Sequence, residues 1–539
     1  IDLVEAHGTG TKVGDATEIR ALKEVYSPHC DVNQVAVGSV KSQIGHAKAA
    51  AGVAGVIKTV MALYNETIPP TIKAEQPAEE LKDSTFYVTP KARPWIPSGS
   101  KPRRAAVSAF GFGGSNFHCV LEEADHPEAF TGGQRVHLMT YGADSKDQLI
   151  TKMKTDMEAL TKGRTMRQLS RDLRQEFSPS SQHRLAFATQ NGDDGVAVLQ
   201  QMLVELQKNT TSSWSSPRGA VYSCETSKGA VAAMFPGQGA QYPGMFQDLA
   251  CDAPQFRQSL QAFQGAAKDL PASLVDMIYS VGIYHDPTKQ KKQVERLKQT
   301  QIAQPALGAT SIGLWQFLKS FGMNADFYCG HSFGELTALC AADVWDISTF
   351  IKCALSRGRF MAEKSDENPG TMVALKGDYA LAQSVVDAIG EEICIANVNS
   401  PNQIVLSGTT PAVRKAIEFC GRQNIVCKEL VVSNAFHSPL MAKAEKKFRT
   451  VVNSSKWLEP SGTVFSNVTG EAYGEDAKAG KSAIVRQLTS TVQFSNMIES
   501  MYEKGARTFI EIGPGARLSG LVDQILGGKE HRCIAMDRS

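Results

Sequence analysis

One stretch of six residues, Gly330 to Glu335, constrains this chain more than any other. It reads GHSFGE, with an apolar run at 327–329 before it and apolar residues at helical spacing after it. This pattern predicts a strand, a sharp turn and a helix, and the flanking glycines allow a strained turn that exposes a serine hydroxyl. We therefore predict that Ser332 is a nucleophile. The pattern GxSxG alone is a weak signal, so other stretches must support it.

The size and charge of the chain narrow its class. A length of 539 residues suggests about three to four folding units with sizeable cores. The 57 basic and 55 acidic residues are spread along the sequence, which gives no electrostatic footprint for nucleic acid or an anionic membrane. The longest apolar stretch, residues 49–64, is too short to span a bilayer. We expect small-molecule or protein partners, and neither nucleic acid nor a membrane.

The eleven cysteines lack the short paired spacings of a zinc or redox site. Most of them lie in apolar runs, as buried thiols do in a reducing compartment. The sequence therefore predicts a cytoplasmic protein without a metal site.

Residues 1–124 contain two histidines beside glycines, His7 in VEAHGTGT and His46 in VKSQIGHAKAAAG. Lys41 precedes the second histidine by five positions, and a glycine-rich GFGGSN follows at 111–116. Either histidine alone would be an ordinary core or turn residue. Together with the lysine and the glycine-rich loop they form a more specific pattern.

Residues 125–228 carry no such pattern. A strand at 136–141, a helix starting at Ser145, a strand at 185–189 and a helix at 196–206 predict a small β-α-β-α unit. The polar tract 209–217 predicts a boundary. We interpret this region as a structural linker domain.

Residues 229–539 hold the serine and a series of further motifs. Between about 364 and 432 short β-like runs predict a small α/β subdomain inserted in a larger one. The motifs around GHSFGE, in chain order, are FPGQGAQ (235–241), TQIAQPAL (300–307), SRGRFM (356–361), NAFHSPLM (434–441), RQL (486–488) and EIGPG (511–515).

These motifs, in this order, resemble the malonyl-CoA:acyl carrier protein acyltransferase family across residues 229–530. The resemblance implies an α/β fold with an α/β-hydrolase-like large subdomain and an inserted ferredoxin-like small subdomain. A ketosynthase end, a small α/β linker domain and an acyltransferase (229–539) are similar to the layout of iterative type I polyketide synthases. Those that make polyunsaturated fatty acids are the nearer resemblance, and enediyne synthases are the rival.

The resemblance implies roles for the serine and for four residues around it. Ser332 would attack the thioester, and His437 would act as its general base. A main-chain carbonyl, at Gln487 here, would orient that histidine in place of an aspartate. Backbone N–H groups of Gln238 and Phe333 would form the oxyanion hole.

Substrate binding would involve three more residues. Arg357 matches the arginine that grips the free carboxylate of malonate, a task suited to a planar guanidinium. Phe436 is similar to the bulky residue of malonyl-specific enzymes, and His331 would also line the substrate site. Asn434 stands where many malonyl enzymes have histidine.

Residues 1–124 resemble the C-terminal part of a β-ketoacyl synthase, half of a thiolase-like fold. His7, Lys41 and His46 match the catalytic histidines and lysine of that family. Its nucleophilic cysteine belongs to the other half of the fold, so we expect this part to be inactive in condensation. The parent synthase is expected to form a homodimer through its ketosynthase.

The implied reaction transfers malonyl from malonyl-CoA through a malonyl-serine, in a ping-pong sequence, to an acyl carrier protein. The acceptor would be the phosphopantetheine thiol of that partner, and no cofactor is expected on this chain. Two basic runs, 289–298 and 443–449, could receive an acidic carrier, but we favour the interpretation that they are solvated helix faces. A serine thioesterase or hydrolase and an inactive docking scaffold are the alternatives.

Overall fold

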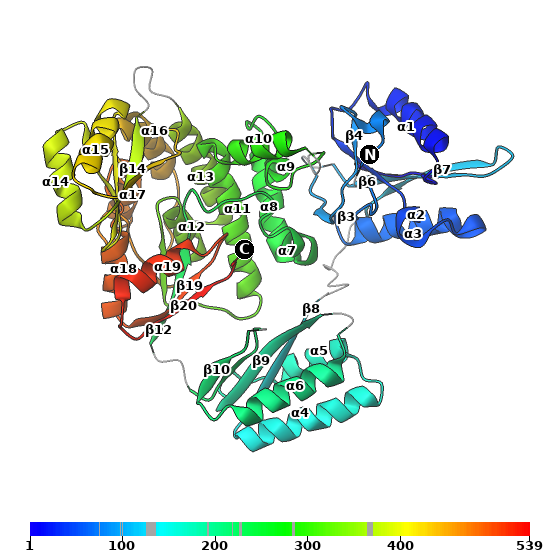
Figure 1. Cartoon of the computed structure of the whole chain (residues 1–539), viewed down its shortest axis with the longest axis horizontal. Coiled ribbons are helices and arrows are strands. Elements are labelled where there is room, and N and C mark those ends of the chain that lie inside the picture. Colours follow the sequence, from blue (N-terminus) through cyan, green and yellow to red (C-terminus); the bar gives the residue numbers. More distant parts are fainter. Residues whose placement is uncertain are drawn as a thin grey trace. The chain divides into compact units, whose positions relative to one another are not determined.

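The computed structural model describes residues 1–538 except 75, 98, 100, 125–135, 191–192, 218, 226–228, 283–285 and 364–369. The chain forms two compact units, residues 131–228 and residues 1–130 with 229–539 (Figure 1). The domain boundaries predicted at 124/125 and 228/229, and the predicted start of the small subdomain, lie outside the described residues. No described helix has both the length and the apolar character needed to cross a membrane.

The first part of the larger unit is a mixed five-stranded sheet in the order β4-β2-β1-β6-β7. All neighbours in it are parallel except β6 and β7, which pair antiparallel. The central strand β1 is buried along its length, as a strand covered on both faces should be. The strands are β1 (Leu3–Glu5), β2 (Val35–Gly38), β4 (Phe86–Tyr87), β6 (Arg104–Phe110) and β7 (Asn116–Glu122), and the helices are α1 (Lys12–Tyr26), α2 (Lys41–Ile44) and α3 (Ala51–Tyr64).

The smaller unit is an antiparallel sheet, β10-β11-β9-β8, packed on three helices. The predicted strand and helix starts are present, and the hydroxyl of Ser145 caps its helix by accepting from Gln148 N–H. The sequence did not predict helix α5 or the β10–β11 hairpin, whose first strand lies in the tract 209–217 interpreted as a boundary. The elements are β8 (Val136–Ala143), α4 (Lys146–Thr161), α5 (Met166–Glu176), β9 (His183–Gln190), α6 (Gly195–Lys208), β10 (Ser213–Ser215) and β11 (Val221–Ser223).

The large subdomain of the acyltransferase-like part is built on a parallel sheet, β18-β13-β12-β19-β20. Two buried apolar clusters cover its opposite faces, which explains why β12 and β13 are almost continuously apolar. The strands are β12 (Ala230–Phe235), β13 (Phe327–Gly330), β18 (Thr463–Val464), β19 (Ala506–Glu511) and β20 (Arg532–Ala535). The helices used below are α7 (Gln247–Asp252), α8 (Pro254–Ala266), α11 (Thr300–Lys319), α12 (Gly334–Ala341), α13 (Ile347–Ala362), α17 (Ala477–Arg486) and α19 (Arg517–Leu526).

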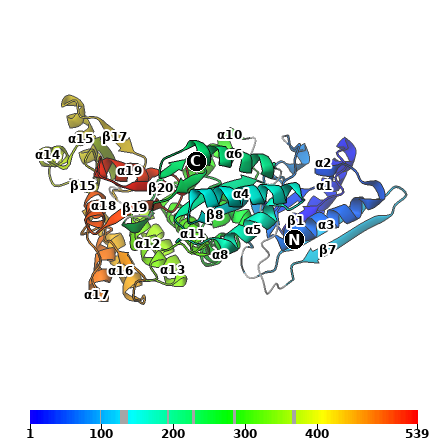
Figure 2. The ribbon, with the colours of Figure 1, turned by 90° about the horizontal axis from the view of Figure 1, so that it is seen from below.

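The small subdomain has a β-α-β-β-α-β element order and an antiparallel sheet, β15-β16-β14-β17. Its two helices pack on one face of the sheet through a separate apolar cluster, and Figure 2 shows α19 of the large subdomain beside it. The elements are β14 (Thr371–Lys376), α14 (Tyr379–Ile389), β15 (Ile393–Ser400), β16 (Gln403–Gly408), α15 (Thr410–Arg422) and β17 (Cys427–Leu430). The predicted α/β class with a ferredoxin-like insertion is confirmed.

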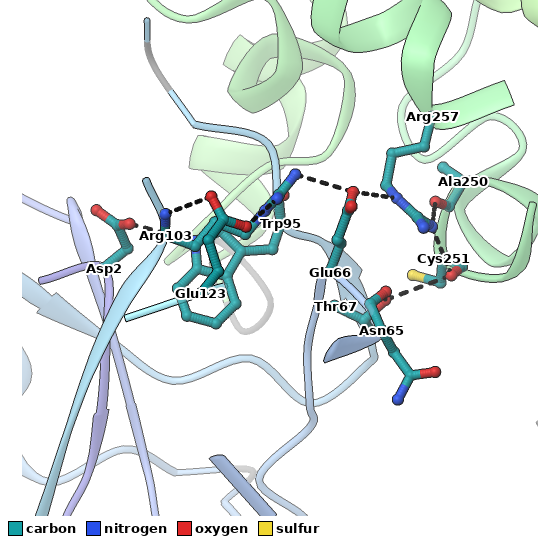
Figure 3. Close-up of polar contacts among 10 residues, drawn as sticks. All are labelled: Asp2, Asn65, Glu66, Thr67, Trp95, Arg103, Glu123, Ala250, Cys251 and Arg257. Atoms are coloured by element: carbon teal, nitrogen blue, oxygen red, sulfur yellow. Dashed lines mark hydrogen bonds and ion pairs between the residues drawn. The ribbon is translucent and has the colours of Figure 1, made fainter. Parts of the chain in front are cut away.

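The ketosynthase-like part contacts the acyltransferase-like part through a polar network (Figure 3). The carboxylate of Glu66 accepts from the guanidinium groups of Arg103 and Arg257, each at 2.9 Å. Arg257, at the start of α8, also donates to the carbonyl oxygens of Ala250 and Cys251. Both arginines are at least 94% buried, so this carboxylate is part of their charge balance.

Candidate active site

The GHSFGE stretch forms the predicted turn between β13 and α12. Ser332 has φ of +52°, a left-handed conformation that is strained for a serine. A Cβ at Gly330 would lie 2.0 Å from the backbone of Gly334, and one at Gly334 would lie 1.9 Å from the carbonyl oxygen of Phe235. Only glycine at both positions lets the chain turn this tightly.

The turn brings the serine to the imidazole predicted as its base. Ser332 Oγ lies 2.7 Å from His437 Nε2, although the residues are 105 positions apart. His437 Nδ1 lies 2.8 Å from the backbone oxygen of Gln487, at the end of α17. A carbonyl oxygen can only accept, so Nδ1 carries the proton and Nε2 offers its lone pair to the serine hydroxyl.

Arg357 projects from α13 into the same site and is fully buried. Its Nη2 donates to Gln487 Oε1 at 2.8 Å and lies 3.4 Å from Ser332 Oγ. Its Nε and Nη1 have no hydrogen-bond partner among the described residues. Buried guanidinium N–H groups are costly when unpaired, so these two donors suit an anionic ligand.

Glu335 is a buried residue of the site that the sequence reasoning gave no role. Its carboxylate accepts from the backbone N–H of Asn467 at 3.0 Å, from the Tyr473 hydroxyl and from Gln487 Nε2 at 2.8 Å. The sequence held one signal for this role, because Glu335 is a glutamate in a helix predicted to be buried. The acid faces the amide of Gln487 and not the imidazole of His437.

The PGQG turn after β12 lies against the serine turn. A Cβ at Gly237 would lie 2.3 Å from the backbone oxygen of His331. The backbone N–H groups of Gln238 and Phe333, predicted as oxyanion donors, have no partner among the described residues. The side-chain amide nitrogen of Gln238 donates to Thr300 Oγ1 at 3.2 Å and to the carbonyl oxygen of Lys298 at 3.4 Å, which leaves the backbone N–H as the available donor of this residue.

A cavity of about 570 Å³ opens beside Ser332, between the two subdomains. His331 and Phe436, which the sequence suggested as substrate contacts, line it together with His437. His331 Nε2 lies 2.7 Å from Asn399 Oδ1 on β15. Asn434 does not line the cavity; its Nδ2 donates to the backbone oxygen of Met361, which does.

Burial sets the protonation of the three central groups. Burial, followed by the charge of Arg357, lowers the pKa of His437 to about 3, so this imidazole is neutral near pH 7. Burial lowers the pKa of Arg357 to about 9, against the opposing influence of Glu335. Burial raises the pKa of Glu335 to about 7, although its hydrogen bonds act in the other direction.

The three ketosynthase-like residues gather in the other part of the larger unit. The ring centroids of His7 and His46 are 5.7 Å apart. Burial lowers the pKa of His7, and the nearby positive charge of Lys41 lowers it further. None of the three lines the Ser332 cavity. That this part is inactive in condensation stays a prediction.

One group of described side chains has metal-ligand character. Asp523 on α19, His531 and Cys533 have ligand atoms within 4.8 Å of one another, and His531 Nε2 lies 3.0 Å from Asp523 Oδ1. Asp523 lies at a distance in the sequence from His531 and Cys533, and the fold brings the three side chains together. The group lies outside the Ser332 cavity, and a hydrogen bond between histidine and aspartate accounts for its geometry.

Comparison with known families agrees with this geometry. A family model described as the acyl transferase domain matches residues 234–532. Models for the C-terminal domain of β-ketoacyl synthase and for the ketoacyl-synthetase C-terminal extension match residues 1–75 and 76–187. The extension model therefore includes strands β4, β6 and β7 of the first sheet and the linker domain as far as β9.

Relatives with known names point the same way. A polyunsaturated fatty acid synthase subunit of Thraustochytrium sp. is 33% identical over 563 residues, which cover 98% of this chain and 20% of that protein. A malonyl CoA-acyl carrier protein transacylase from Clostridium perfringens is 31% identical with a TM-score of 0.51, covering 57% of this chain and 94% of the other. A malonyl-transacylase in complex with a holo type II polyketide synthase acyl carrier protein is 30% identical with a TM-score of 0.52, covering 57% and 96%.

The chain thus spans a fifth of the length of its polyunsaturated fatty acid synthase relative. It matches that relative over 98% of its own length and the solved transacylase from Clostridium perfringens over 57%. This chain belongs to the acyl transferase domain family, and the C-terminal part of a β-ketoacyl synthase precedes that domain.

Proposed function

We propose that this chain transfers malonyl from malonyl-CoA to the phosphopantetheine thiol of an acyl carrier protein through a malonyl ester on Ser332. The observation that carries this proposal is the buried guanidinium of Arg357, whose Nη2 lies 3.4 Å from Ser332 Oγ and whose Nε and Nη1 have no partner among the described residues. A carboxylate separated from the reacting carbonyl by a methylene, as in malonate, would satisfy both donors.

In the first half-reaction His437 Nε2 takes the Ser332 proton as Oγ attacks the thioester carbonyl. The oxyanion accepts hydrogen bonds from the N–H groups of Gln238 and Phe333. The tetrahedral intermediate then collapses, the C–S bond breaks, and the proton on His437 leaves with the coenzyme A thiolate. Malonyl remains as an ester on the serine.

In the second half-reaction the carrier thiol gives its proton to His437 Nε2 and its sulfur attacks the ester. The tetrahedral intermediate then collapses, His437 Nε2 returns its proton to Ser332 Oγ as the C–O bond breaks, and malonyl leaves on the carrier. The Gln487 carbonyl keeps Nδ1 protonated throughout, so Nε2 carries every proton transfer.

Selection of malonyl over a branched extender unit is assigned to Phe436, whose ring lines the cavity. Asn434 would act indirectly, by holding the backbone of Met361 at the cavity wall. One methyl group is worth about 1–3 kcal/mol of discrimination, so a single bulky ring is a sufficient device.

A serine hydrolase is the alternative in which water replaces the carrier thiol. It would use an acidic partner for His437 and would have no need of Arg357. Among the described residues His437 Nδ1 contacts a carbonyl oxygen, which favours the transferase. The docking-scaffold alternative predicts that Ser332 takes up no acyl group.

The proposal extends to the setting of the enzyme. All eleven cysteines are free thiols, which suits a reducing cytoplasm. The parent synthase is proposed to be a homodimer through its ketosynthase, with its own carrier domains as acceptors. We propose no bound cofactor for the transfer.

Intact-protein mass spectrometry after brief exposure to malonyl-CoA tests the proposal. A malonyl adduct is expected on Ser332, absent in Ser332→Ala and absent with methylmalonyl-CoA. Arg357→Ala should slow malonyl loading about a hundredfold, because two charge-assisted hydrogen bonds are lost.

Arg359→Ala is the matched control, since that side chain lies two residues along α13 and is 58% exposed. It should load malonyl at the wild-type rate. Unchanged loading in Arg357→Ala would favour the hydrolase, and no adduct in the wild-type protein would favour the scaffold.

A further inference from the structure

The sheet of the small subdomain forms one wall of the cleft. Along β14, Val373 and Leu375 point into the core beneath α14 and α15. Because side chains alternate along a strand, Met372, Ala374 and Lys376 lie on the opposite face. That face is apolar near Ser332 and becomes cationic toward the end of the strand.

The neighbouring strands continue this gradient. Ala374 stands opposite Lys428 on β17, and Lys376 stands opposite Gln403 on β16, so all four lie on the cleft face. The acidic residue next to Lys428, Glu429, stands opposite Val373 and therefore lies on the other face.

Two cavities meet along this wall. The cavity beside Ser332 and a second one of about 440 Å³ share Ala374, Gln403 and Gln524 in their linings. Lys376 and Lys428 line the second cavity, and neither an aspartate nor a glutamate is among the described residues around it. Met372 and Lys376 are about 13 Å apart along the strand, at roughly 3.3 Å per residue.

Four side chains along this wall, Lys376, Lys428, Gln403 and Gln524, offer N–H donors that have no acceptor among the described residues. Neither lysine ammonium contacts an acceptor among the described residues, which contrasts with Lys447 in the same half of the molecule, paired with Glu363. The Oε1 atoms of Gln403 and Gln524 accept from Asn399 and Ser400. Their amide N–H groups thus remain available to a ligand.

We propose that Lys376 and Lys428 form the subsite for the phosphate groups of the coenzyme A donor. This inference rests on the proposed function. With the acyl group at Ser332, the pantetheine arm follows the apolar wall, its amide carbonyls accept from Gln403 and Gln524, and its phosphates reach the two lysines. A long ligand with an apolar arm and an anionic end matches the sequence of surfaces in the cleft.

Malonyl thioesters with and without phosphate groups distinguish an effect on this subsite from an effect on the reacting centre. The experiment measures kcat/KM for Ser332 loading from malonyl-CoA and from the malonyl thioester of N-acetylcysteamine, which has no phosphate. In the double variant Lys376→Gln/Lys428→Gln, kcat/KM for malonyl-CoA should fall about tenfold, through KM, and become less sensitive to salt. The value for the phosphate-free donor should change less than about twofold.

Lys415→Gln is the matched control, because Lys415 lies on α15, which covers the other face of the sheet. It should leave both donors unchanged. An equal loss with both donors, or no loss with either, overturns the subsite. A loss confined to discharge onto a holo carrier protein overturns it too, because the lysines would then serve the carrier's phosphopantetheine.

If wild-type protein takes malonyl from neither donor, the proposed transferase function fails. That outcome is distinct from an unchanged double variant of an active protein.

Discussion

At the scale of single residues, Glu335 decides which way a neighbouring amide faces. Gln487 Nε2 donates to this carboxylate, which leaves Gln487 Oε1 toward Arg357. If the amide were reversed, its NH2 group would meet the guanidinium donor to donor. Glu335 is thus a positioning residue for the arginine, and it acts without touching His437.

Burial of Glu335 should make stability depend on pH. Its pKa is raised from 4.5 to about 7, so the folded state holds a proton that the unfolded state releases within that window. The contribution of the Glu335 proton to the free energy of unfolding is fully present below pH 4.5 and is lost as the pH rises through 7. We expect the free energy of unfolding of wild type, relative to Glu335→Gln, to fall by about 3 kcal/mol across this range.

Chemical denaturation of both proteins at pH 4.5 and pH 7.5 measures this difference. The amide of Glu335→Gln has one acceptor oxygen, so it cannot accept from the Asn467 and Tyr473 donors on one side and from Gln487 Nε2 on the other. Its absolute stability is therefore not the readout. A pH-independent difference would show that the carboxylate stays ionised throughout.

At the scale of elements, the contact between α12 and the end of β12 leaves no space for a side chain. A Cβ at Gly334 would meet the backbone oxygen of Phe235, and backbone cannot move aside as a flexible side chain can. Gly334→Ala should therefore lower stability by roughly 3 kcal/mol or more and abolish malonyl loading at Ser332.

Gly421, near the end of α15, is the matched glycine, because no heavy atom lies within 4 Å of the position that a Cβ would take there. Gly421→Ala should raise stability by up to about 0.5–1 kcal/mol through helix propensity and leave loading unchanged. Thermal unfolding of both variants checks the pair, and equal melting temperatures would refute the steric argument.

At the scale of the whole molecule, Glu66 joins the ketosynthase-like and acyltransferase-like parts (Figure 3). Glu66→Gln leaves two buried guanidinium groups without this counter-charge. The expected cost is roughly 1–2 kcal/mol, below the cost for a fully buried pair, because the Glu66 side chain is 37% exposed.

Thermal unfolding and hydrogen exchange measure that cost, with faster exchange expected around Cys251 and Arg257. Glu122→Gln is the control, since Glu122 pairs with Arg104 and both side chains are about half exposed. It should change stability by less than about 1 kcal/mol. Equal effects of the two variants would mean that the network does not join the two parts.

The sequence by itself determined the fold class, the order of the motifs and the local turn at Ser332. The α/β alternation and the turn follow from periodicity and glycine placement, which act over a few residues, whereas the hydrolase-like and ferredoxin-like subdomains followed from the resemblance of the ordered motifs. It also led to Ser332, His437, Gln487 and Arg357 as a set, because their motifs resemble those of one family. Helix α5 escaped prediction although its capping box, Thr165 with Gln168, and its buried Leu169 and Leu173 were an available sequence signal. The short strands β10 and β11 escaped prediction because they exist through pairing with each other and with β9.

Only the tertiary structure decided how distant side chains combine. It joined Ser332 to His437 across 105 positions and turned the Gln487 amide toward Glu335. It also placed Lys376 and Lys428 on the cleft face of a sheet. Hydrogen-bond direction, burial and strand register depend on the packing of whole elements, and local sequence patterns carry no record of that packing.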